Sequence, residues 1–324
     1  MHVYAFMSRG DTSSPSATDR PAAVAGPVSR RASVPSHPAA PQGTISPLLA
    51  RNVSSGTEPL SAAQLYEREW VPALFDKWAQ NTAKLAPAKA GDAALDVACG
   101  TGVVARLVAA QTGITGRVTG IDLNPCMLEV ARTQSEPQDD LSLGTVEFRQ
   151  ADACNLPFPD ASFQVAYCQF GLQFFADRAK ALREMRRVLV PEGRVALTVW
   201  GAIEKSPGFA ILARALERDI GATEAQIVRS AYSSCSPSEM RSMMEAAGFC
   251  DVAIATHSES VQFRSVDHFI TTCVTGSRLG EAVFKADQCT RRILIDRVRA
   301  GLARYERPDG LCFPVEALLV RARR

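Results

Sequence analysis

The residues best suited to chemistry in this chain are a glycine turn and the acidic residues around it. The segment LDVACGTG (95–102) places Gly100 and Gly102 between an apolar run and a helix-like stretch. Glycine permits positive φ and lets a ligand lie against bare backbone. Asp122 ends the next apolar run, and its carboxylate can accept hydrogen bonds from both hydroxyls of a ribose. Turn and carboxylate together indicate a site for a nucleoside-containing ligand.

Two classes of ligand fit this pattern. Residues 100–105 match the G-x-G-x-x-G/A pattern of dinucleotide enzymes, which would make the protein a nicotinamide-dependent oxidoreductase. Asp96, however, lies inside the apolar run, where a carboxylate is costly unless it meets a cation or donors. The sulfonium and ammonium groups of S-adenosylmethionine would provide the cation, whereas a pyrophosphate would be repelled. Asp152 and Ala153, after the third run, could read an adenine, and residues 157–200 carry no obvious hydride-transfer constellation.

The elements that must position these residues alternate between strand and helix. Alternation of this kind predicts parallel βαβ units in a doubly wound α/β sheet, with ligands bound where the strands end. The predicted strands are 94–97, 117–123, 146–149, 163–168 and 195–200. One predicted helix is capped by Ser61, a second follows the glycine turn and runs through Ala110, and two more begin at Pro125 and at about Arg178. The sequence of residues 190–193 (VPEG) predicts a turn before the fifth strand.

The pattern changes after residue 200. Residues 207–232, 237–247 and 266–305 are helix-like, and residues 252–263 and 311–320 are strand-like. By analogy with other α/β enzymes, we expect helices within 201–236 and 266–305 to form a cap over the ligand site. Trp200, Phe209 and Tyr232 lie where this cap begins and would form either an apolar substrate wall or cap core.

The composition is that of an ordinary globular protein, and the net charge is too small to produce a strong electrostatic field. Net charge is +2 and 46% of residues are hydrophobic, so nothing favours a nucleic-acid or membrane-surface partner. No apolar run approaches the ~18 residues of a transmembrane helix. The nine cysteines form no CxxC pair, which argues for reduced thiols and against a zinc site. We expect a soluble cytoplasmic protein with a small-molecule partner and no metal; the oligomeric state stays open.

Residues 1–57 differ from the rest. They are rich in Ser, Pro, Ala and Arg, poor in acids and without helical or strand period, so they cannot bury enough apolar area to offset their ordering entropy. We expect a disordered tail, or alternatively an organelle transit peptide, followed by one domain over residues 58–324.

Four blocks of sequence resemble the class I S-adenosylmethionine-dependent methyltransferases, and the ubiquinone/menaquinone-biosynthesis subgroup most of all. The blocks are LDVACGTG (95–102), GIDLNPCML (120–128), ADACNLPFPDASFQV (151–165) and LREMRRVLVPEGRVAL (182–197). They occur in the family's order and spacing, and the likeness extends over roughly 61–323. The resemblance implies a Rossmann-like seven-stranded sheet of order 3-2-1-4-5-7-6 with its last strand reversed.

The resemblance also implies roles for individual residues. The methionine moiety of the cofactor would lie against Asp96 and the turn, and the backbone near Gln169 would meet its amino group. Asp122 would bind the ribose. The adenine would lie among residues of the second and third blocks. The cofactor-binding set is Asp96, Ala98, Gly100, Thr101, Gly102, Asp122, Leu123, Met127, Asp152, Ala153 and Gln169. Two positions depart from the family: Ala98 replaces its first glycine, and Gln164 replaces a usual aspartate, which we expect to be structural.

Catalytic residues are harder to find. Methyl transfer from a sulfonium needs alignment and exclusion of water more than a general base. The candidates are His257 on a late strand, Tyr66 on the first helix and Gln169 after the fourth strand; His257 could equally be a surface group, and Tyr66 could be core. The sequence therefore favours methyl transfer to O, N or C of a small, partly apolar metabolite. A nicotinamide-dependent oxidoreductase and a non-methylating protein that binds S-adenosylmethionine remain as alternatives.

Overall fold

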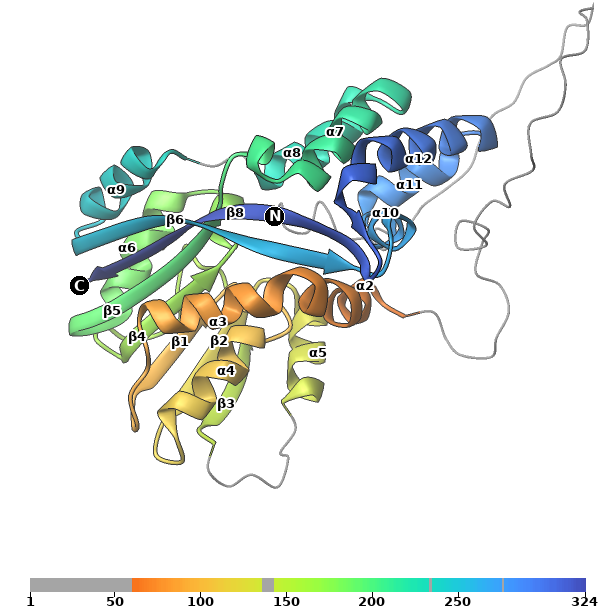
Figure 1. The fold of residues 1–324 in the computed structure, drawn as a ribbon. Coiled ribbons are helices and arrows are strands. Elements are labelled where there is room, and N and C mark those ends of the chain that lie inside the picture. Colours follow the sequence, from red (N-terminus) through yellow and green to blue (C-terminus); the bar gives the residue numbers. More distant parts are fainter. Residues whose placement is uncertain (1–59, 136–142, 233–234, 276) are drawn as a thin grey trace, which may run out of the picture.

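A computed structural model describes residues 60–135, 143–232, 235–275 and 277–324. The chain forms one sheet of order β3-β2-β1-β4-β5-β8-β6 with helices on both faces (Figure 1). Only β8 is antiparallel to its neighbours β5 and β6 in this order. The predicted seven-stranded arrangement is confirmed, with β8 as the reversed strand, and a two-residue strand, β7, pairs with β8 as an addition. The predicted tail, residues 1–57, lies outside the described residues.

The strands and helices follow the predicted alternation closely. The strands are β1 Ala93–Val97, β2 Arg117–Asp122, β3 Thr145–Gln150, β4 Phe163–Gln169, β5 Leu189–Trp200, β6 Cys250–Phe263, β7 Glu306–Arg307 and β8 Gly310–Arg323. The helices before β5, apart from the three-residue η3 Leu172–Phe174, are α2 Ala62–Leu65, η2 Tyr66–Phe75, α3 Asp76–Leu85, α4 Val103–Thr112, α5 Pro125–Gln134 and α6 Arg178–Val188. The later helices are α7 Pro207–Asp219, α8 Ala222–Ala231, α9 Pro237–Ala246, α10 Val266–Val274, α11 Arg278–Lys285 and α12 Gln288–Leu302.

The helix starts follow from local chemistry. Ser61 and Ser236 each form a capping box at the start of α2 and α9, so that the side chains satisfy two backbone donors that lack a helical partner. Asn124 caps α5, whose first residue is Pro125, a position where the missing N–H costs nothing. These signals explain why the sequence predicts the starts of the helices well.

The first helix contains an unexpected stretch. Residues 66–75 wind as a π-helix, η2, that contains Pro72 and continues directly into α3. π-Helical turns are rare, and they occur often at functional sites. Nothing in the sequence pattern distinguishes this winding from an α-helix.

The sheet separates two cores, and a third lies beside it. Helices α3, α4 and α5 pack on one face, while α6 and α9 pack on the other. The third core joins η2 to α7, α8 and α10–α12 around the far halves of β6 and β8. In Figure 1 these helices stand over one end of the sheet, where the long strands β6 and β8 reach beyond β5. The cap boundaries stay a prediction, but helices do occupy this end.

One local prediction differs from the structure, and another agrees with it. The predicted turn at 190–193 lies within β5, where the pairing with β4 shifts register and Glu192 has a φ of 62°. The turn residues therefore produce an irregularity in the strand rather than a separate turn. Gln164 has the structural role expected of it, because its side chain accepts the Ala93 N–H at 2.8 Å.

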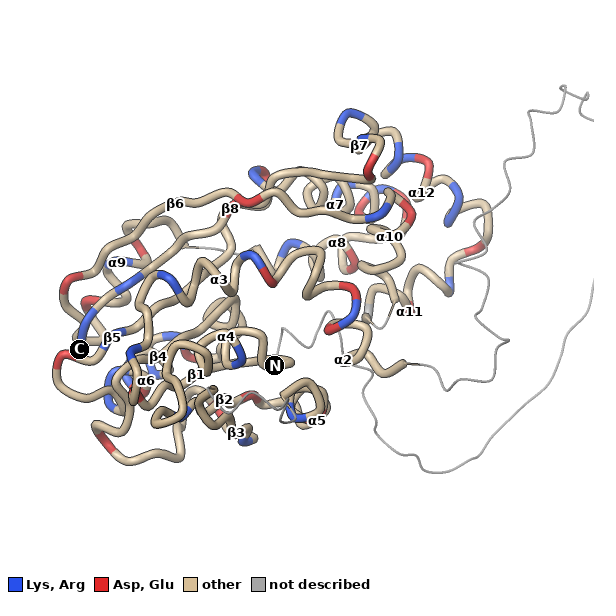
Figure 2. Tube along the Cα trace, turned by 60° about the horizontal axis from the view of Figure 1, so that its bottom comes forward, with Lys and Arg blue, Asp and Glu red and all other residues tan. Residues whose placement is uncertain are grey.

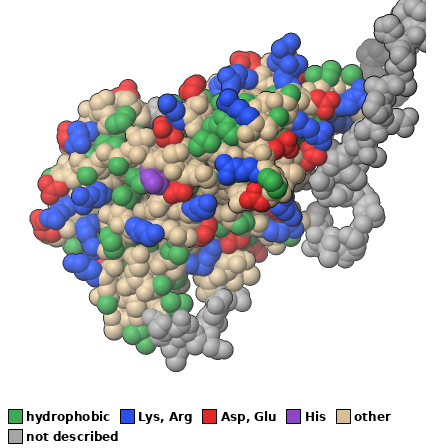
Figure 3. Space-filling view, viewed as in Figure 1, with side chains coloured by type: hydrophobic (Ala, Val, Ile, Leu, Met, Phe, Trp, Pro, Cys, Tyr) green, Lys and Arg blue, Asp and Glu red, His purple; other side chains and the backbone are tan. Residues whose placement is uncertain are grey.

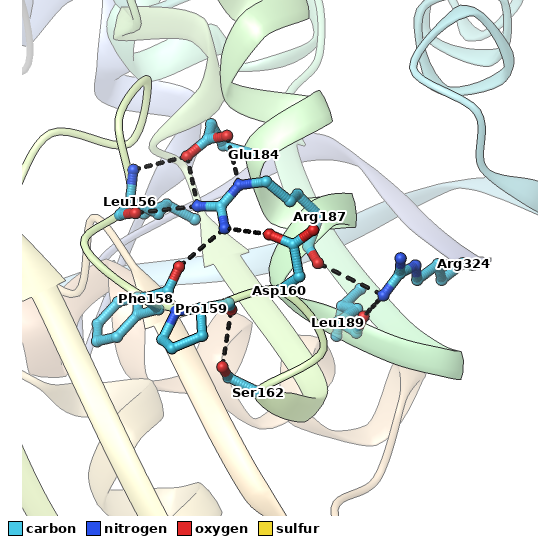
Figure 4. A network of polar contacts seen from close by, with 9 residues as sticks. All are labelled: Leu156, Phe158, Pro159, Asp160, Ser162, Glu184, Arg187, Leu189 and Arg324. Carbon is cyan, nitrogen blue, oxygen red and sulfur yellow. Dashed lines mark hydrogen bonds and ion pairs between the residues drawn. The ribbon is translucent and has the colours of Figure 1, made fainter.

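A network around Arg187 fixes the segment that follows β3 (Figure 4). The Arg187 guanidinium donates to both carboxylate oxygens of Glu184 at 2.8 Å and to Asp160 Oδ1 at 2.8 Å. It also donates to the carbonyls of Phe158 and Leu156. The pKa of Glu184 is lowered, mainly by its hydrogen bonds with Arg187. Arg187 thereby ties α6 to residues 156–160.

Arg187→Met keeps the apolar stem of the side chain and removes the guanidinium. We expect the free energy of unfolding to fall by about 2–3 kcal/mol, because several charge-assisted hydrogen bonds are lost at a partly exposed site. Urea titration followed by circular dichroism measures this change. Arg183→Met, at an exposed arginine of the same helix, is the control and should change stability little; an equal loss in both variants would refute the role of the network.

Candidate functional site

A cavity of about 370 Å³ opens where the strands β1, β2 and β4 end. Its walls come from the glycine turn, from the residues after β2, β3 and β4, and from η2, α7 and α8. This is the edge at which doubly wound sheets bind ligands. The cavity therefore joins the predicted nucleoside site to the predicted cap.

Asp122 is the best-defined polar group of the cavity. Its side chain is buried, and its two oxygens accept the Gly100 N–H and the Asn124 N–H, each at 2.9 Å. Burial raises the pKa of this carboxyl above its usual value, and the hydrogen bonds from Asn124 and Gly100 oppose the rise. Each carboxylate oxygen can accept a second hydrogen bond, so the group remains able to receive ligand hydroxyls.

The turn itself needs a left-handed backbone at three positions. Ala98, Gly100 and Gly102 have φ values of 58°, 54° and 85°. A Cβ on Gly102 would come within 2.8 Å of the Phe148 ring, so glycine is required there by space as well as by φ. Ala98 adopts the conformation despite its methyl group, at a cost of about 1–2 kcal/mol, and the Ala98 methyl in turn leaves no room for a Cβ at Gly171.

The predicted adenine residues also meet at the cavity. Leu123, Met127, Asp152 and Ala153 all line it. Met127 and Ala153 are buried, whereas Leu123 is 46% exposed. Asp152 Oδ1 accepts the Cys154 N–H at 2.8 Å, which orients the carboxylate. These side chains offer apolar surface for a ring and one acceptor for its edge.

Three predicted cofactor residues do not line the cavity. Asp96 lies behind the turn, and within the turn Ala98 and Gly100 face the cavity whereas Thr101 and Gly102 do not. Asp96 Oδ2 accepts the Ala105 N–H at 3.0 Å, so the carboxylate joins β1 to the start of α4. Burial raises the pKa of Asp96 to about 7, partly opposed by the Ala105 hydrogen bond and by Arg106. Because Asp96 does not line the cavity, it can act on a ligand only through the electrostatic field of its carboxylate.

Two of the three catalytic candidates line the cavity. Tyr66 does so from η2, with its ring stacked on Phe75 at 4.9 Å between centroids. Burial raises the pKa of Tyr66 well above its usual range, which leaves the hydroxyl protonated. Gln169 is held from two sides, since its Oε1 accepts from Thr82 at 3.2 Å and its Nε2 donates to the Phe75 carbonyl at 3.3 Å.

The structure does not bring His257 to the cavity. Its Nε2 lies 2.8 Å from Glu259 Oε1, and its ring packs edge-on against Trp78 at 5.7 Å. The pKa of Glu259 is lowered, with the largest favourable contribution from its hydrogen bond with His257. These contacts stabilise the outer strand β6, and His257 is not part of the cavity.

The other end of the cavity is aromatic, and the sequence identified only part of it. Phe170, with a strained φ of 52°, stacks on Trp200 at 3.4 Å between ring centroids. Tyr232 lies 5.5 Å from Trp200 and 5.4 Å from Phe209. Among the described residues that line the cavity, Asp122 and Asp152 alone are charged, and both belong to the opposite end. Phe170 was not predicted as a wall residue, because it lies just past the end of β4, where no strand or helix period marks it.

Comparisons with known proteins agree with this geometry. The family described as "Methyltransferase domain" matches residues 95–197. A demethylmenaquinone methyltransferase of Listeria welshimeri is 41% identical over 123 residues, which are 38% of this chain and 51% of that protein. The ubiquinone/menaquinone biosynthesis C-methyltransferase UbiE of Ectopseudomonas mendocina is 39% identical over 141 residues, 44% of this chain and 53% of that one. The chain thus spans about half the length of the curated relatives it matches.

Residues 95–197 thus match a methyltransferase domain, and the relatives that share this region carry the names of quinone-biosynthesis enzymes. Solved structures extend the likeness of fold beyond the matched residues. The YcgJ protein of Bacillus subtilis has a TM-score of 0.52 at 21% identity and covers 76% of this chain and 97% of its own. Haemonchus contortus phosphoethanolamine N-methyltransferase 2, solved with phosphomonomethylethanolamine and S-adenosylhomocysteine, has a TM-score of 0.50 at 19% identity, covering 82% and 57%.

The described ranges contain neither a metal-site candidate nor a membrane-span candidate. No group of three or more His, Cys, Asp or Glu there could hold a metal ion. No helix in the same ranges is long and apolar enough to cross a bilayer. The face of the molecule seen in Figure 3 mixes acidic, basic and apolar side chains. The cavity is therefore the site on which a function can be built.

Asp122→Ala tests the assignment of this carboxylate to the ribose. We expect the affinity for S-adenosylhomocysteine, measured by calorimetry, to fall by about 1.5–3 kcal/mol, because hydrogen bonds to a charged group are lost. Asp296→Ala, at an exposed position of α12, is the control. An unchanged affinity in a folded Asp122 variant would show that the assignment is wrong.

Asp96 gives cofactor binding a pH dependence with a defined sign. Its carboxyl is protonated below about pH 7, and only the ionised form attracts a cationic ligand. The affinity for S-adenosylhomocysteine, which keeps its ammonium group, should therefore rise with pH, by at most about tenfold between pH 6 and 8. In Asp96→Asn, which keeps an acceptor for Ala105, the calorimetric profile should be flat. A profile of the same steepness in both proteins would contradict this role.

Proposed function

We propose that this chain is an S-adenosylmethionine-dependent methyltransferase that methylates O, N or C of a small, uncharged and largely apolar metabolite. The observation that carries the proposal is one cavity with two chemically distinct ends. Asp122, Asp152 and the glycine turn form the polar end, and aromatic rings form the other. A methyl donor and an apolar acceptor need such an arrangement, because they must meet in one water-poor space.

The polar end fits the cofactor by its donor set. The Asp122 carboxylate, held by two backbone N–H groups, suits a ribose diol, and Asp152 suits an amino group on a ring edge. The Gly100 backbone leaves space that a side chain would fill. When bound, S-adenosylmethionine supplies a methyl group whose sulfonium leaving group is already activated. The residues of this chain orient the two partners and keep water out.

The aromatic end favours an uncharged acceptor. Phe170, Trp200, Phe209 and Tyr232 bring large apolar faces together, and an ionised group placed among them would lose its hydration without a partner. A phosphate-bearing acceptor has no cation here to meet it. A planar apolar ring, by contrast, can stack on these side chains. Such an acceptor is consistent with the quinone-biosynthesis names of the relatives.

The cavity offers little help with proton removal. Burial raises the pKa of both Tyr66 and Tyr232 well above the usual value, so neither hydroxyl is a base near neutral pH. The Gln169 amide is neutral and is held between Thr82 and Phe75. Gln169 can therefore act on the acceptor only as a hydrogen-bond partner, through its remaining N–H or its remaining Oε1 lone pair. The acceptor must be nucleophilic without a strong general base, or must lose its proton to solvent after the bond to the methyl carbon has formed.

The other expectations about partners and place extend the same proposal. The nicotinamide alternative finds no support in the comparisons, whereas a protein that binds the cofactor without methylating remains an outcome of the test. We propose a small-molecule partner, no nucleic-acid partner and a cytoplasmic place of action. The transit-peptide alternative concerns residues 1–57, outside the described residues.

Labelled methyl transfer tests the proposal. We expect incorporation of label from S-adenosylmethionine into neutral aromatic acceptors such as hydroquinones and naphthols, and none into phosphoethanolamine. Trp200→Ala should raise KM for the acceptor by roughly tenfold or more, since a buried aromatic face is lost, while S-adenosylhomocysteine affinity stays unchanged. Cofactor binding without labelled product from any acceptor would favour the non-methylating alternative, and a preference for charged acceptors would refute the substrate class.

A further inference from the structure

The helical segment before the sheet lies directly over the glycine turn. A methyl carbon added to Gly100 would be 3.9 Å from Tyr66 Cε1 and 4.0 Å from the Tyr66 hydroxyl oxygen. Tyr66, Trp70 and Phe75 of η2 all line the cavity. The same ten residues thus form a wall for both the polar and the aromatic end, and their position decides the shape of the site.

Arg106 connects this segment to the turn through two contacts of one guanidinium. Its Nη1 donates to the Thr101 carbonyl at 2.5 Å, and its Nη2 donates to Glu67 Oε1 at 2.8 Å. Thr101 lies within the glycine turn, and Glu67 follows Tyr66 in η2. Charges of both signs gather at the start of this helix, next to α2 (Figure 2). One arginine therefore sets the distance between the Tyr66 ring and the Gly100 backbone.

The contact is shielded enough to matter energetically. The side chains of Arg106 and Glu67 are 25% and 15% exposed, so the pair is less screened than a surface salt bridge. Glu67 Oε2 is buried without a hydrogen-bond partner in the described structure. Arg106 is thus the ion-pair partner of a poorly solvated carboxylate. Without Arg106, residues 66–75 would have to move to rehydrate Glu67.

A second connection holds the other side of the same segment. Glu69 Oε2 accepts from His268 Nε2 at 2.8 Å and from the Arg264 guanidinium at 2.9 Å, and both of these residues lie at the start of the cap helix α10. The segment is therefore fixed to the cap through Glu69 and to the turn through Glu67. Of these two links, only the one through Glu67 contacts the turn on which the cofactor is expected to lie.

We propose that Arg106 is a positioning residue that seats residues 66–75 on the glycine turn and couples closing of this segment to cofactor binding. This inference rests on the proposed function, because it takes the turn as the cofactor site. This role depends on the two nitrogens of the Arg106 guanidinium. Nη2 binds Glu67 of residues 66–75, and Nη1 binds the Thr101 carbonyl. Lysine, with a single ammonium group, cannot reproduce both contacts in the same geometry.

The test compares Arg106→Gln, Arg106→Lys, Glu67→Gln and the double variant by calorimetry with S-adenosylhomocysteine. Hydrogen exchange of residues 62–75 is measured with and without the same ligand. Arg297→Gln is the matched control, because Arg297 pairs with the buried Asp219 at 2.7 Å between two cap helices. We expect about tenfold weaker binding in Arg106→Gln, partial recovery in Arg106→Lys, and no further loss beyond about twofold in the double variant.

Hydrogen exchange separates positioning from general stability. In the unmodified protein and in Arg297→Gln, the ligand should protect residues 62–75; in Arg106→Gln this protection should be lost. If Arg106→Gln does not fold, Glu67→Gln gives the same test, since its neutral amide weakens the link from the other side. Binding within about twofold of the unmodified protein, or an equal loss in Arg297→Gln, would overturn the inference and leave the proposed function intact. Failure of the unmodified protein to bind the ligand would overturn the proposed function itself.

Discussion

The Asp122 carboxylate joins two turns that must lie together for any ligand to bind. Its oxygens accept one N–H from the turn after β1 and one from the turn after β2, so the ends of two parallel strands share one buried anion. Burial makes that anion costly, as its raised pKa shows, and backbone donors offset only part of the cost. A ligand with hydroxyl donors would offset more. The Asp122 carboxylate at the polar end of the cavity can therefore accept hydrogen bonds from a ligand in addition to those from its two backbone donors.

The rest of the molecule places an aromatic surface in the same cavity as the Asp122 carboxylate. Strained backbone at Ala98 and Phe170 brings the glycine turn and an aromatic ring to one cavity, and such strain persists only where packing on all sides enforces it. Phe148 fills the space that Gly102 leaves open, and η2 closes the cavity between the turn and the cap. Polar and aromatic ends meet because three separate cores converge there.

Local sequence signals predicted the elements well, because caps, glycines and apolar periods act over a few residues. The sheet order and the role of Met127 came from the family resemblance, whereas residue type and spacing already indicated the roles of Asp122 and Asp152. All three of these side chains line the cavity. What the sequence could not predict depends on long-range packing. His257 faces Glu259 rather than the site, Asp96 lies behind the turn, and Arg187 and Arg106 make ion pairs with partners whose proximity is set by the tertiary fold. The π-helical winding of η2 also leaves no local signature.

The central claim is that one cavity holds S-adenosylmethionine at the Asp122 end and an apolar acceptor among the aromatic rings. The most direct test is a crystal structure of the protein with S-adenosylhomocysteine. We predict both ribose hydroxyls within about 3.2 Å of the Asp122 carboxylate oxygens, and the ligand sulfur directed toward Phe170 and Trp200. A ligand bound elsewhere, or with its ribose away from Asp122, would contradict the account.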